Sequence, residues 1–304
     1  MKILQWLNDT NVGGTSDTVD IICRYSENNF VIGTKKLGTM AEEFIKHSPV
    51  YAVEDIEDLE NLVDKENIDL VQINCGGNEL LDIHNWCNDL NIKYIDCIHN
   101  AGVSISQAVG VIGISPMIQN YQTKKIDIIT TPIEWKKFSK SKGGTIGRLG
   151  RVEEGKGCFD WVEVVRRLYK QNSNLKFSHA GTGSEIEKVE QLLKDIPVNF
   201  WGEIRNLSDY YGQLNVFLYP TTDETLCLGI LQAFAARVPV VTYELEATEL
   251  YKDYCMRTEV LDFNKLVYYT LNPQVDVEAA YEYVKKNHDP IIQIKKYDEV
   301  YKKF

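Results

Sequence analysis

Short apolar runs alternate with amphipathic segments along most of the chain. The runs KILQWL (2–7), IDLVQIN (68–74) and KYIDCIHN (93–100) have the length and residue types of buried strands. Segments 54–67 and 158–170 instead place apolar residues at helical spacing, opposite charged positions. Such alternation is typical of parallel sheets, whose strands are joined by helical crossovers, so we expect an α/β protein. Further expected elements are a loop over 8–17 and helices near 79–90, 184–195 and 228–236.

A small, polar segment with two glycines, SKSKGG (139–144), divides this alternation in two. A chain of 304 residues is long enough for two domains. We therefore predict two doubly wound, Rossmann-like domains facing a cleft, over residues 1–138 and 139–284, followed by a C-terminal helix over 285–304. In doubly wound sheets ligands bind beyond the carboxyl ends of the strands.

Composition excludes several classes of function. The net charge of −11 lies mostly in residues 1–140, and an acidic surface repels polyanions, so nucleic acid is an unlikely partner. There is no run of 18 apolar residues and no signal-peptide pattern, which predicts a cytoplasmic protein without stable membrane insertion. The seven cysteines have no CxxC spacing and the five histidines no HxxxH spacing, so neither a disulfide framework nor a metal site is expected.

The segment LGRVEEGKG (149–157) has the chemistry of an anion site. Arg151 and Lys156 follow an apolar strand, and Gly157 opens a helix, whose N-terminus attracts anions. Arginine adds a planar donor fork and lysine a mobile point charge, as a diphosphate requires. Two alternatives stay open: the cations are simply exposed on a loop, or Arg148 takes the place of Arg151.

Glu224 stands in PTTDETLCLG (220–229), between a strand end and an apolar helix. An unpaired buried carboxylate is costly, so this side chain is either solvated or held there for a ligand. The backbone amides after it can present N–H groups to an anion, and Gln232 follows by eight residues, about two helical turns. The alternative is that Glu224 caps the helix and Gln232 is a partly buried polar group.

A glycine turn, HAGTGSEIE (179–187), also follows an expected strand and leads into a helix. Alone it fits a tight turn as well as a nucleotide contact. Together, however, the motifs Gly150-Arg151…Lys156-Gly157, Gly181-Thr182-Gly183, Glu224-x7-Gln232 and PVV (239–241) stand in an order that resembles the retaining GT-B glycosyltransferases, family-4-like (glycosyl transferases group 1). The resemblance covers about residues 110–250 and is looser over 1–110.

The resemblance implies roles for individual residues. Arg151 and Lys156 would hold the diphosphate of a sugar donor without a metal, and Glu224 would bind the hydroxyls of the sugar. His99 in CIHN would lie near the reacting centre, although it also fits a hydrogen-bonded core histidine. Further donor-binding positions that the resemblance implies are Gly13, Gly14, Gly183, Glu203, Ile204, Thr225, Leu226, Cys227, Leu228 and Gln232.

Three positions depart from the family pattern: Gln232 replaces a glutamate, Leu226 and Cys227 stand in place of the usual glycine, and Arg237 occupies another glycine position. An amide can still bond ribose hydroxyls, but it carries no charge. The family likeness implies a retaining hexosyltransferase that uses a UDP- or GDP-sugar and no cofactor, with a glycan, lipid-linked or small-molecule acceptor. The alternatives are a catalytically silent nucleotide-sugar-binding subunit and a sugar-nucleotide epimerase.

The C-terminal segment 281–304 is lysine-rich and amphipathic, with Ile294, Tyr297, Tyr301 and Phe304 on one helical face. The family likeness favours a helix that packs back on the N-terminal domain. A basic amphipathic helix can instead lie on an anionic membrane, which would make the protein peripheral at the membrane surface.

Overall fold

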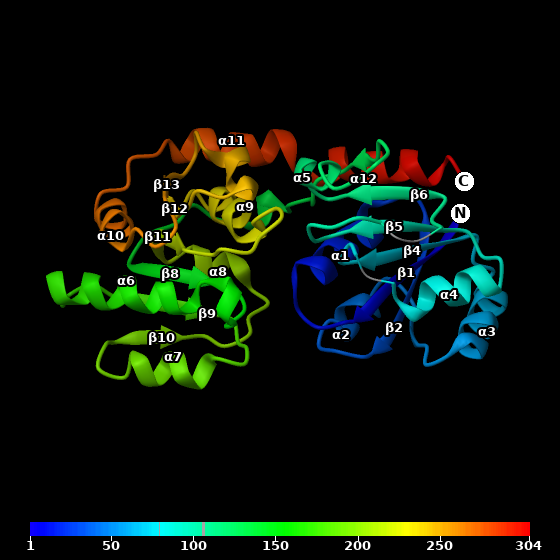
Figure 1. Ribbon diagram of the computed structural model, residues 1–304, viewed down its shortest axis with the longest axis horizontal. Helices are drawn as coiled ribbons and strands as arrows, with labels where there is room; N and C mark the ends of the chain where they lie inside the picture. The colour runs from blue at the N-terminus through cyan, green and yellow to red at the C-terminus, as the bar shows by residue number, and fades with distance from the viewer. Residues whose placement is uncertain (79, 105–106) are drawn as a thin grey trace. The chain divides into compact units, whose positions relative to one another are not determined.

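The chain forms two compact units in a computed structural model that describes residues 1–78, 80–104 and 107–304 (Figure 1). Unit 1 comprises Met1–Pro132 and His288–Phe304, and unit 2 comprises Ile133–Asn287. Each unit has one parallel sheet with helical connections, which confirms the predicted pair of Rossmann-like α/β domains. The units divide after Pro132 and after Asn287, whereas the sequence placed the divisions after residues 138 and 284.

Unit 1 is built on a seven-stranded sheet with the order β3-β2-β1-β4-β5-β6-β7. Its central strands, β1 and β4, are apolar runs interrupted by Gln5, Gln72 and Asn74, all of them buried. The elements of unit 1 before its C-terminal segment are β1 (Lys2–Asp9), α1 (Gly14–Tyr25), β2 (Asn29–Lys36), α2 (Ala41–Phe44), β3 (Val50–Ala52), α3 (Ile56–Glu66), β4 (Leu70–Cys75), α4 (Asp82–Asp89), β5 (Tyr94–Ile98), β6 (Gly110–Gly113), α5 (Pro116–Gln119) and β7 (Asp127–Ile128).

Two expectations for unit 1 need correction. The first strand is followed by only a short loop, because helix α1 begins at Gly14, inside the loop expected over 8–17. The helix expected near 79–90 is α4, which begins at Asp82, and residue 79 lies outside the described residues. The shorter loop places Gly13 and Gly14 directly at a helix N-terminus.

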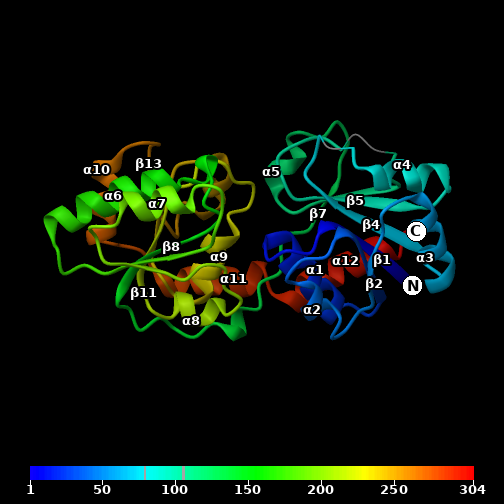
Figure 2. The same ribbon diagram turned by 90° about the horizontal axis from the view of Figure 1, so that it is seen from below.

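Helix α12 (Pro290–Tyr301) completes unit 1 from the far end of the sequence. It lies beside α1, as Figure 2 shows, and it buries Ile294, Tyr297 and Tyr301 on one face. These three residues have the helical spacing that the sequence indicated. The hydroxyl of Tyr301 reaches the buried amides of β1 and β4.

Unit 2 has a six-stranded sheet with the order β10-β9-β8-β11-β12-β13. Three short 3-10 helices also occur in it: η1 (Trp135–Lys137), η2 (Glu154–Lys156) and η3 (Glu246–Tyr251). Its strands and α-helices are β8 (Thr145–Leu149), α6 (Cys158–Gln171), β9 (Phe177–Ala180), α7 (Ile186–Leu192), β10 (Val198–Phe200), α8 (Leu207–Tyr211), β11 (Leu214–Tyr219), α9 (Leu228–Ala235), β12 (Val240–Tyr243), β13 (Met256–Thr258), α10 (Phe263–Leu271) and α11 (Val277–Asn287).

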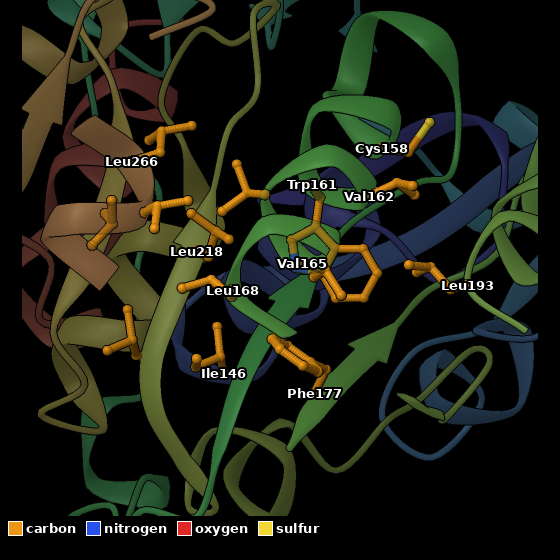
Figure 3. Packing of buried hydrophobic residues seen from close by; sticks show 14 of the residues in the cluster. Ile146, Cys158, Trp161, Val162, Val165, Leu168, Phe177, Leu193, Leu218 and Leu266 are labelled. Atoms are coloured by element: carbon orange, nitrogen blue, oxygen red, sulfur yellow. The ribbon is translucent and has the colours of Figure 1, made fainter. Parts of the chain in front are cut away.

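The core of unit 2 forms where α6 packs on the sheet (Figure 3). Trp161, Val165 and Leu168 recur at helical spacing and are fully buried. They meet Ile146 of β8 and Phe177 of β9 in the same apolar cluster. Burial of such side chains stabilises the fold by about 1.5–3 kcal/mol each. The cluster fixes β8 and α6, and therefore the loop that joins them.

Candidate functional site

The loop between β8 and α6 carries both predicted diphosphate-binding cations. The Arg151 side chain is 66% exposed and pairs with Glu153, its Nη1 lying 2.9 Å from Oε2. Lys156 ends the 3-10 helix η2, and its side chain is only 18% exposed. The two cations therefore differ: Arg151 is exposed at the surface, whereas Lys156 is largely covered by its neighbours.

Gly157 fixes this loop against the segment after β11. Its φ of 68° lies in the left-handed region, which glycine adopts without strain. A Cβ atom at Gly157 would lie 1.8 Å from the carbonyl oxygen of Pro220. Only glycine permits this approach, so the residue brings the loop 150–157 next to the loop that carries Glu224.

Arg148 is not available to a ligand, because its guanidinium is fully buried. One terminal nitrogen, Nη2, donates to the backbone oxygens of Arg151, at 2.9 Å, and Lys156, at 2.5 Å. Burial lowers the pKa of the guanidinium, and the side chain has no carboxylate partner within the described chain. Of the two arginines that the sequence offered for the diphosphate, Arg148 holds the shape of the loop, while Arg151 faces solvent. The structure therefore favours Arg151 for that role.

Glu224 is held by hydroxyl groups at the carboxyl end of β11. Its Oε1 accepts hydrogen bonds from the Tyr219 hydroxyl at 2.7 Å and from Thr221 Oγ1 at 3.3 Å. The carboxylate is 16% exposed, which leaves part of it accessible to a ligand. Burial and the nearby Glu224 raise the pKa of Tyr219 well above its ordinary value, so this hydroxyl stays a donor. Sequence reasoning missed Tyr219 and Thr221 as partners of Glu224. Their position at the end of β11, where ligand sites of parallel sheets lie, is the signal that could have indicated them.

Lys156 joins the two loops electrostatically. Its Nζ lies 3.5 Å from Glu224 Oε1 and 3.3 Å from Asp223 Oδ2, and it donates to the backbone oxygen of Asp223. The ammonium of Lys156 thus lies between the Glu224 carboxylate and the Asp223 loop. The structure therefore brings Lys156 and Glu224 together, whereas their contact with a donor stays a prediction.

The glycine turn 181–183 has a structural explanation of its own. Cβ atoms at Gly181 and Gly183 would lie 2.2 Å from the Gly150 oxygen and 2.5 Å from the Val152 oxygen, respectively. Val152 N donates to the Thr182 oxygen at 2.9 Å, so the two loops continue the pairing of β8 with β9. Because these residues are glycines, the backbone of the turn 181–183 can lie directly against the loop 150–157. A contact of Gly183 with the donor stays a prediction.

The expected helical relation between Glu224 and Gln232 is wrong. Helix α9 begins at Leu228, after Cys227 in left-handed conformation with φ 57°, so Glu224 precedes the helix altogether. Gln232 is buried, and its Oε1 accepts from the Tyr211 hydroxyl at 3.3 Å. The family pattern has a glycine near Cys227, and Cys227 here adopts the left-handed conformation that glycine adopts without strain.

The other predicted donor positions of unit 2 lie in the segment that leads into α9 and in the segment after β10. Thr225 and Leu226 are buried with Cys227, while Leu228 is partly exposed. The Tyr251 hydroxyl donates to the Leu226 oxygen at 2.6 Å and fixes this segment. After β10, Glu203 is exposed and Ile204 partly exposed.

The predicted site residues of unit 1 lie after its strands. Gly13 and Gly14 form the exposed start of α1, where a Cβ at Gly13 would meet open space. His99 follows β5, and its Nε2 lies 3.2 Å from Asn74 Oδ1. Burial of the imidazole lowers its pKa to about 4, so His99 is neutral at neutral pH.

One group of metal-ligating side chains occurs among the described residues, namely Cys75, His84 and Asp96 of unit 1. His84 Nε2 lies 3.1 Å from Asp96 Oδ1, and the amide of Leu81 donates to His84 Nδ1 at 2.9 Å. These two bonds use both ring nitrogens and account for the burial of the imidazole. All seven cysteines are free thiols, and all except Cys23 are buried.

Part of the chain is similar to known proteins. Residues 143–262 match the family of glycosyl transferases group 1. The matched residues include the loop 150–157, the glycine turn 181–183 and Glu224. An uncharacterized glycosyltransferase of Haemophilus influenzae is 27% identical over 132 residues, which are 41% of this chain and 37% of that protein. The sulfoquinovosyl transferase SQD2 of Arabidopsis thaliana is 30% identical over 98 residues, 32% of this chain and 18% of that protein.

The chain thus spans well under half of the length of either curated relative. Across its whole length, this chain superposes on Anabaena Alr3699/HepE in complex with UDP and glucose, with a TM-score of 0.85 and 13% identity over 100% of both chains. A second structure of HepE contains UDP-glucose. The fold is therefore that of the GT-B glycosyltransferases. Within the described residues, no helix has the length and apolar content needed to span a bilayer.

Proposed function

We propose that this protein is a glycosyltransferase that moves a sugar from a nucleoside-diphosphate sugar to an acceptor hydroxyl, with retention of configuration and without a metal ion. The observation that carries the proposal is the contact of Lys156 with Glu224 beside the loop 150–157. The group 1 match over residues 143–262 and the GT-B fold support it.

In this proposal the donor diphosphate binds at the loop 150–157. Arg151 turns from Glu153, and Lys156 turns from Glu224, to neutralise the charge that develops on the departing diphosphate. Glu224, still held by Tyr219, accepts hydrogen bonds from sugar hydroxyls. The acceptor oxygen bonds to the anomeric carbon as the bond from that carbon to the diphosphate breaks, and a diphosphate oxygen takes the proton of the acceptor hydroxyl. The charge on the departing diphosphate is then stabilised by Arg151 and Lys156.

A UDP-sugar is the proposed donor, because UDP and UDP-glucose occupy the structural neighbour HepE. A GDP-sugar is the second choice. The acceptor is proposed to be a glycan, a lipid-linked sugar or a small molecule, and the expected location is the cytoplasm, with the membrane surface as the alternative. No cofactor is part of the proposed reaction.

Donor turnover in two variants tests the proposal. Arg151→Ala and Lys156→Ala each remove a cation from the leaving group, and we expect kcat to fall about 10²- to 10³-fold for Lys156→Ala, with a smaller loss for the exposed Arg151. The measurement is UDP release from a panel of UDP- and GDP-sugars, with acceptors present and EDTA added. Lys252→Ala, an exposed cation of unit 2 paired with Glu249, is the matched control.

Wild-type rates in both site variants would refute the proposed function. Nucleotide-sugar binding by calorimetry without any turnover would favour the silent subunit, a reading that Gln232 at the glutamate position supports. Conversion of a sugar nucleotide to its epimer in the absence of acceptor would favour the epimerase. The anomeric configuration of the product, read by NMR, decides retention.

A further inference from the structure

Four buried polar side chains of unit 1 form a closed ring of hydrogen bonds. They are Gln5 of β1, Gln72 and Asn74 of β4, and Tyr301 of α12, and none is more than 6% exposed. Asn74 Nδ2 donates to Gln5 Oε1 at 3.1 Å, and Gln5 Nε2 donates to the Tyr301 hydroxyl at 3.2 Å. That hydroxyl donates to Gln72 Oε1 at 2.7 Å, and Gln72 Nε2 donates to Asn74 Oδ1 at 3.1 Å.

A backbone carbonyl fixes the direction of this ring. Asn74 Nδ2 lies 3.0 Å from the carbonyl oxygen of Trp6, which can only accept. The amide nitrogen of Asn74 therefore faces Trp6, and Oδ1 must face the other way. Every side-chain nitrogen and oxygen atom of the ring then has at least one partner, as buried polar groups require.

His99 is attached to this ring through Asn74. Its Nε2 lies 3.2 Å from Asn74 Oδ1, and an amide oxygen only accepts, so Nε2 must carry the hydrogen. The imidazole is neutral at neutral pH, as its lowered pKa of about 4 requires. A neutral imidazole has a single N–H, so Nδ1 carries a lone pair. Within the described part of the chain Nδ1 has no hydrogen-bond partner, and the His99 side chain is partly exposed.

We propose that Asn74 is a positioning residue that fixes His99 as the Nε2–H tautomer and so presents Nδ1 as an acceptor for a hydroxyl group of the bound sugar substrate. The role of His99 towards a sugar rests on the proposed function. The tautomer itself rests only on the contacts of Asn74 with Trp6 and His99. Asn74 is buried in β4, where Gln72 is the other polar residue, and a buried polar side chain is costly unless it is hydrogen-bonded.

The test combines a spectroscopic measurement with kinetics. In wild-type protein labelled with ¹⁵N-histidine, we expect His99 to show a protonated Nε2 and an unprotonated Nδ1 at pH 7.5. The signals are assigned by their loss in His99→Gln, since the chain has only five histidines. Asn74→Leu removes the acceptor, so the His99 shifts should move towards the average of the two tautomers, and kcat should fall about tenfold with little change in KM for the donor.

Tyr301→Phe is the matched control for a structural effect. It opens the same ring, leaving Gln5 and Gln72 each without one partner, but it keeps Asn74 fixed on Trp6. We expect Tm to fall by about 2–4 °C in this variant, with the His99 tautomer and kcat unchanged. Asn74→Asp, which still accepts from Nε2–H, should keep the tautomer of the wild type.

Several outcomes decide the inference. A wild-type His99 protonated at Nδ1, or an Asn74→Leu variant with unchanged shifts, overturns it. Equal losses of kcat in Asn74→Leu and Tyr301→Phe also overturn it, because the effect would then be structural. If wild-type protein turns over no sugar nucleotide, the proposed function fails, and the NMR result alone still decides whether Asn74 sets the tautomer.

Discussion

Gly157 shows how a single residue positions the candidate site. Its left-handed conformation and its close approach to Pro220 bring the loop 150–157 beside the loop that carries Glu224. Both features exclude a side chain, one through backbone strain and the other through direct overlap with backbone. The proximity of Lys156 to Glu224 therefore depends on a glycine at this position.

The variant Gly157→Ala should therefore lower the free energy of unfolding by about 3 kcal/mol, combining the strain with the overlap. Gly202→Ala isolates the strain alone, because Gly202 also has a positive φ, 65°, while a Cβ there meets nothing within 4 Å. That control should lose about 1 kcal/mol. Urea denaturation of the three proteins measures both values, and equal losses would show that the contact with Pro220 is not tight.

At the same scale, sequence reasoning found Arg151, Lys156 and Glu224 because each follows an apolar run, and ligand sites of parallel sheets lie after strands. It could not choose between Arg148 and Arg151, since burial of Arg148 depends on which face of β8 meets the loop. It also took the eight-residue spacing of Glu224 and Gln232 as helical. The left-handed Cys227 between them delays the helix, and no feature of its residue type signals that conformation.

Helix α12 illustrates what amphipathic pattern predicts about an element and what it leaves open. The spacing of Ile294, Tyr297 and Tyr301 indicated one buried face. The polar partners of that helix were not predictable, because Tyr301 bonds to Gln72, which is 229 positions away in sequence. The same holds for Asp298, which is buried and accepts hydrogen bonds from Ser26 and Asn28 at the end of α1.

Removal of the Asp298 carboxylate should destabilise unit 1 through these two donors. Asp298→Ala leaves the Ser26 hydroxyl without its acceptor and the Asn28 amide with only Ser26 Oγ, and we expect a loss of about 2 kcal/mol in the free energy of unfolding. Glu299→Ala, at the neighbouring exposed position of α12, should change it by less than about 0.5 kcal/mol. Similar stability of the two variants in chemical denaturation would contradict the packing described for α12.

At the scale of the whole molecule, buried neutral histidines make both units sensitive to acid. His179 in unit 2 and His288 in unit 1 are each 1% exposed, and burial lowers their pKa values to about 3 and about 4 from an ordinary 6.5. The unfolded chain therefore binds protons that the folded chain does not, once the pH falls below 6.5. Their contribution to stability is complete above that pH and is lost as pH falls from 6.5 towards 4.

Between pH 7 and pH 5, each of these histidines should remove about 2 kcal/mol of unfolding free energy. Urea titrations at the two pH values measure the loss. His288→Asn, which retains a donor for the Thr131 oxygen, should reduce the pH-dependent part for unit 1 although the variant is less stable at pH 7. An unchanged pH dependence in His288→Asn would refute the assignment to this residue.

The division of the chain into two parallel-sheet units was the most predictable property of the molecule, because alternation of strands and helices requires parallel sheets with crossovers. The exact boundaries of the two units were not predictable, since the divisions after Pro132 and Asn287 are set by packing rather than by composition. The polar linker at 139–144 suggested a later start for unit 2. In the structure that segment already packs within unit 2, where the Ser141 amide donates to the Ala236 oxygen at 2.9 Å.

The membership of residues 288–304 in unit 1 has a consequence for biosynthesis. Unit 2 is one uninterrupted stretch of sequence and is translated complete, whereas the first sheet is made before Tyr301 exists to join Gln5 and Gln72. On the ribosome, Gln5 and Gln72 therefore lack their Tyr301 partner until α12 has been synthesised, by which time the whole of unit 2 has already been translated.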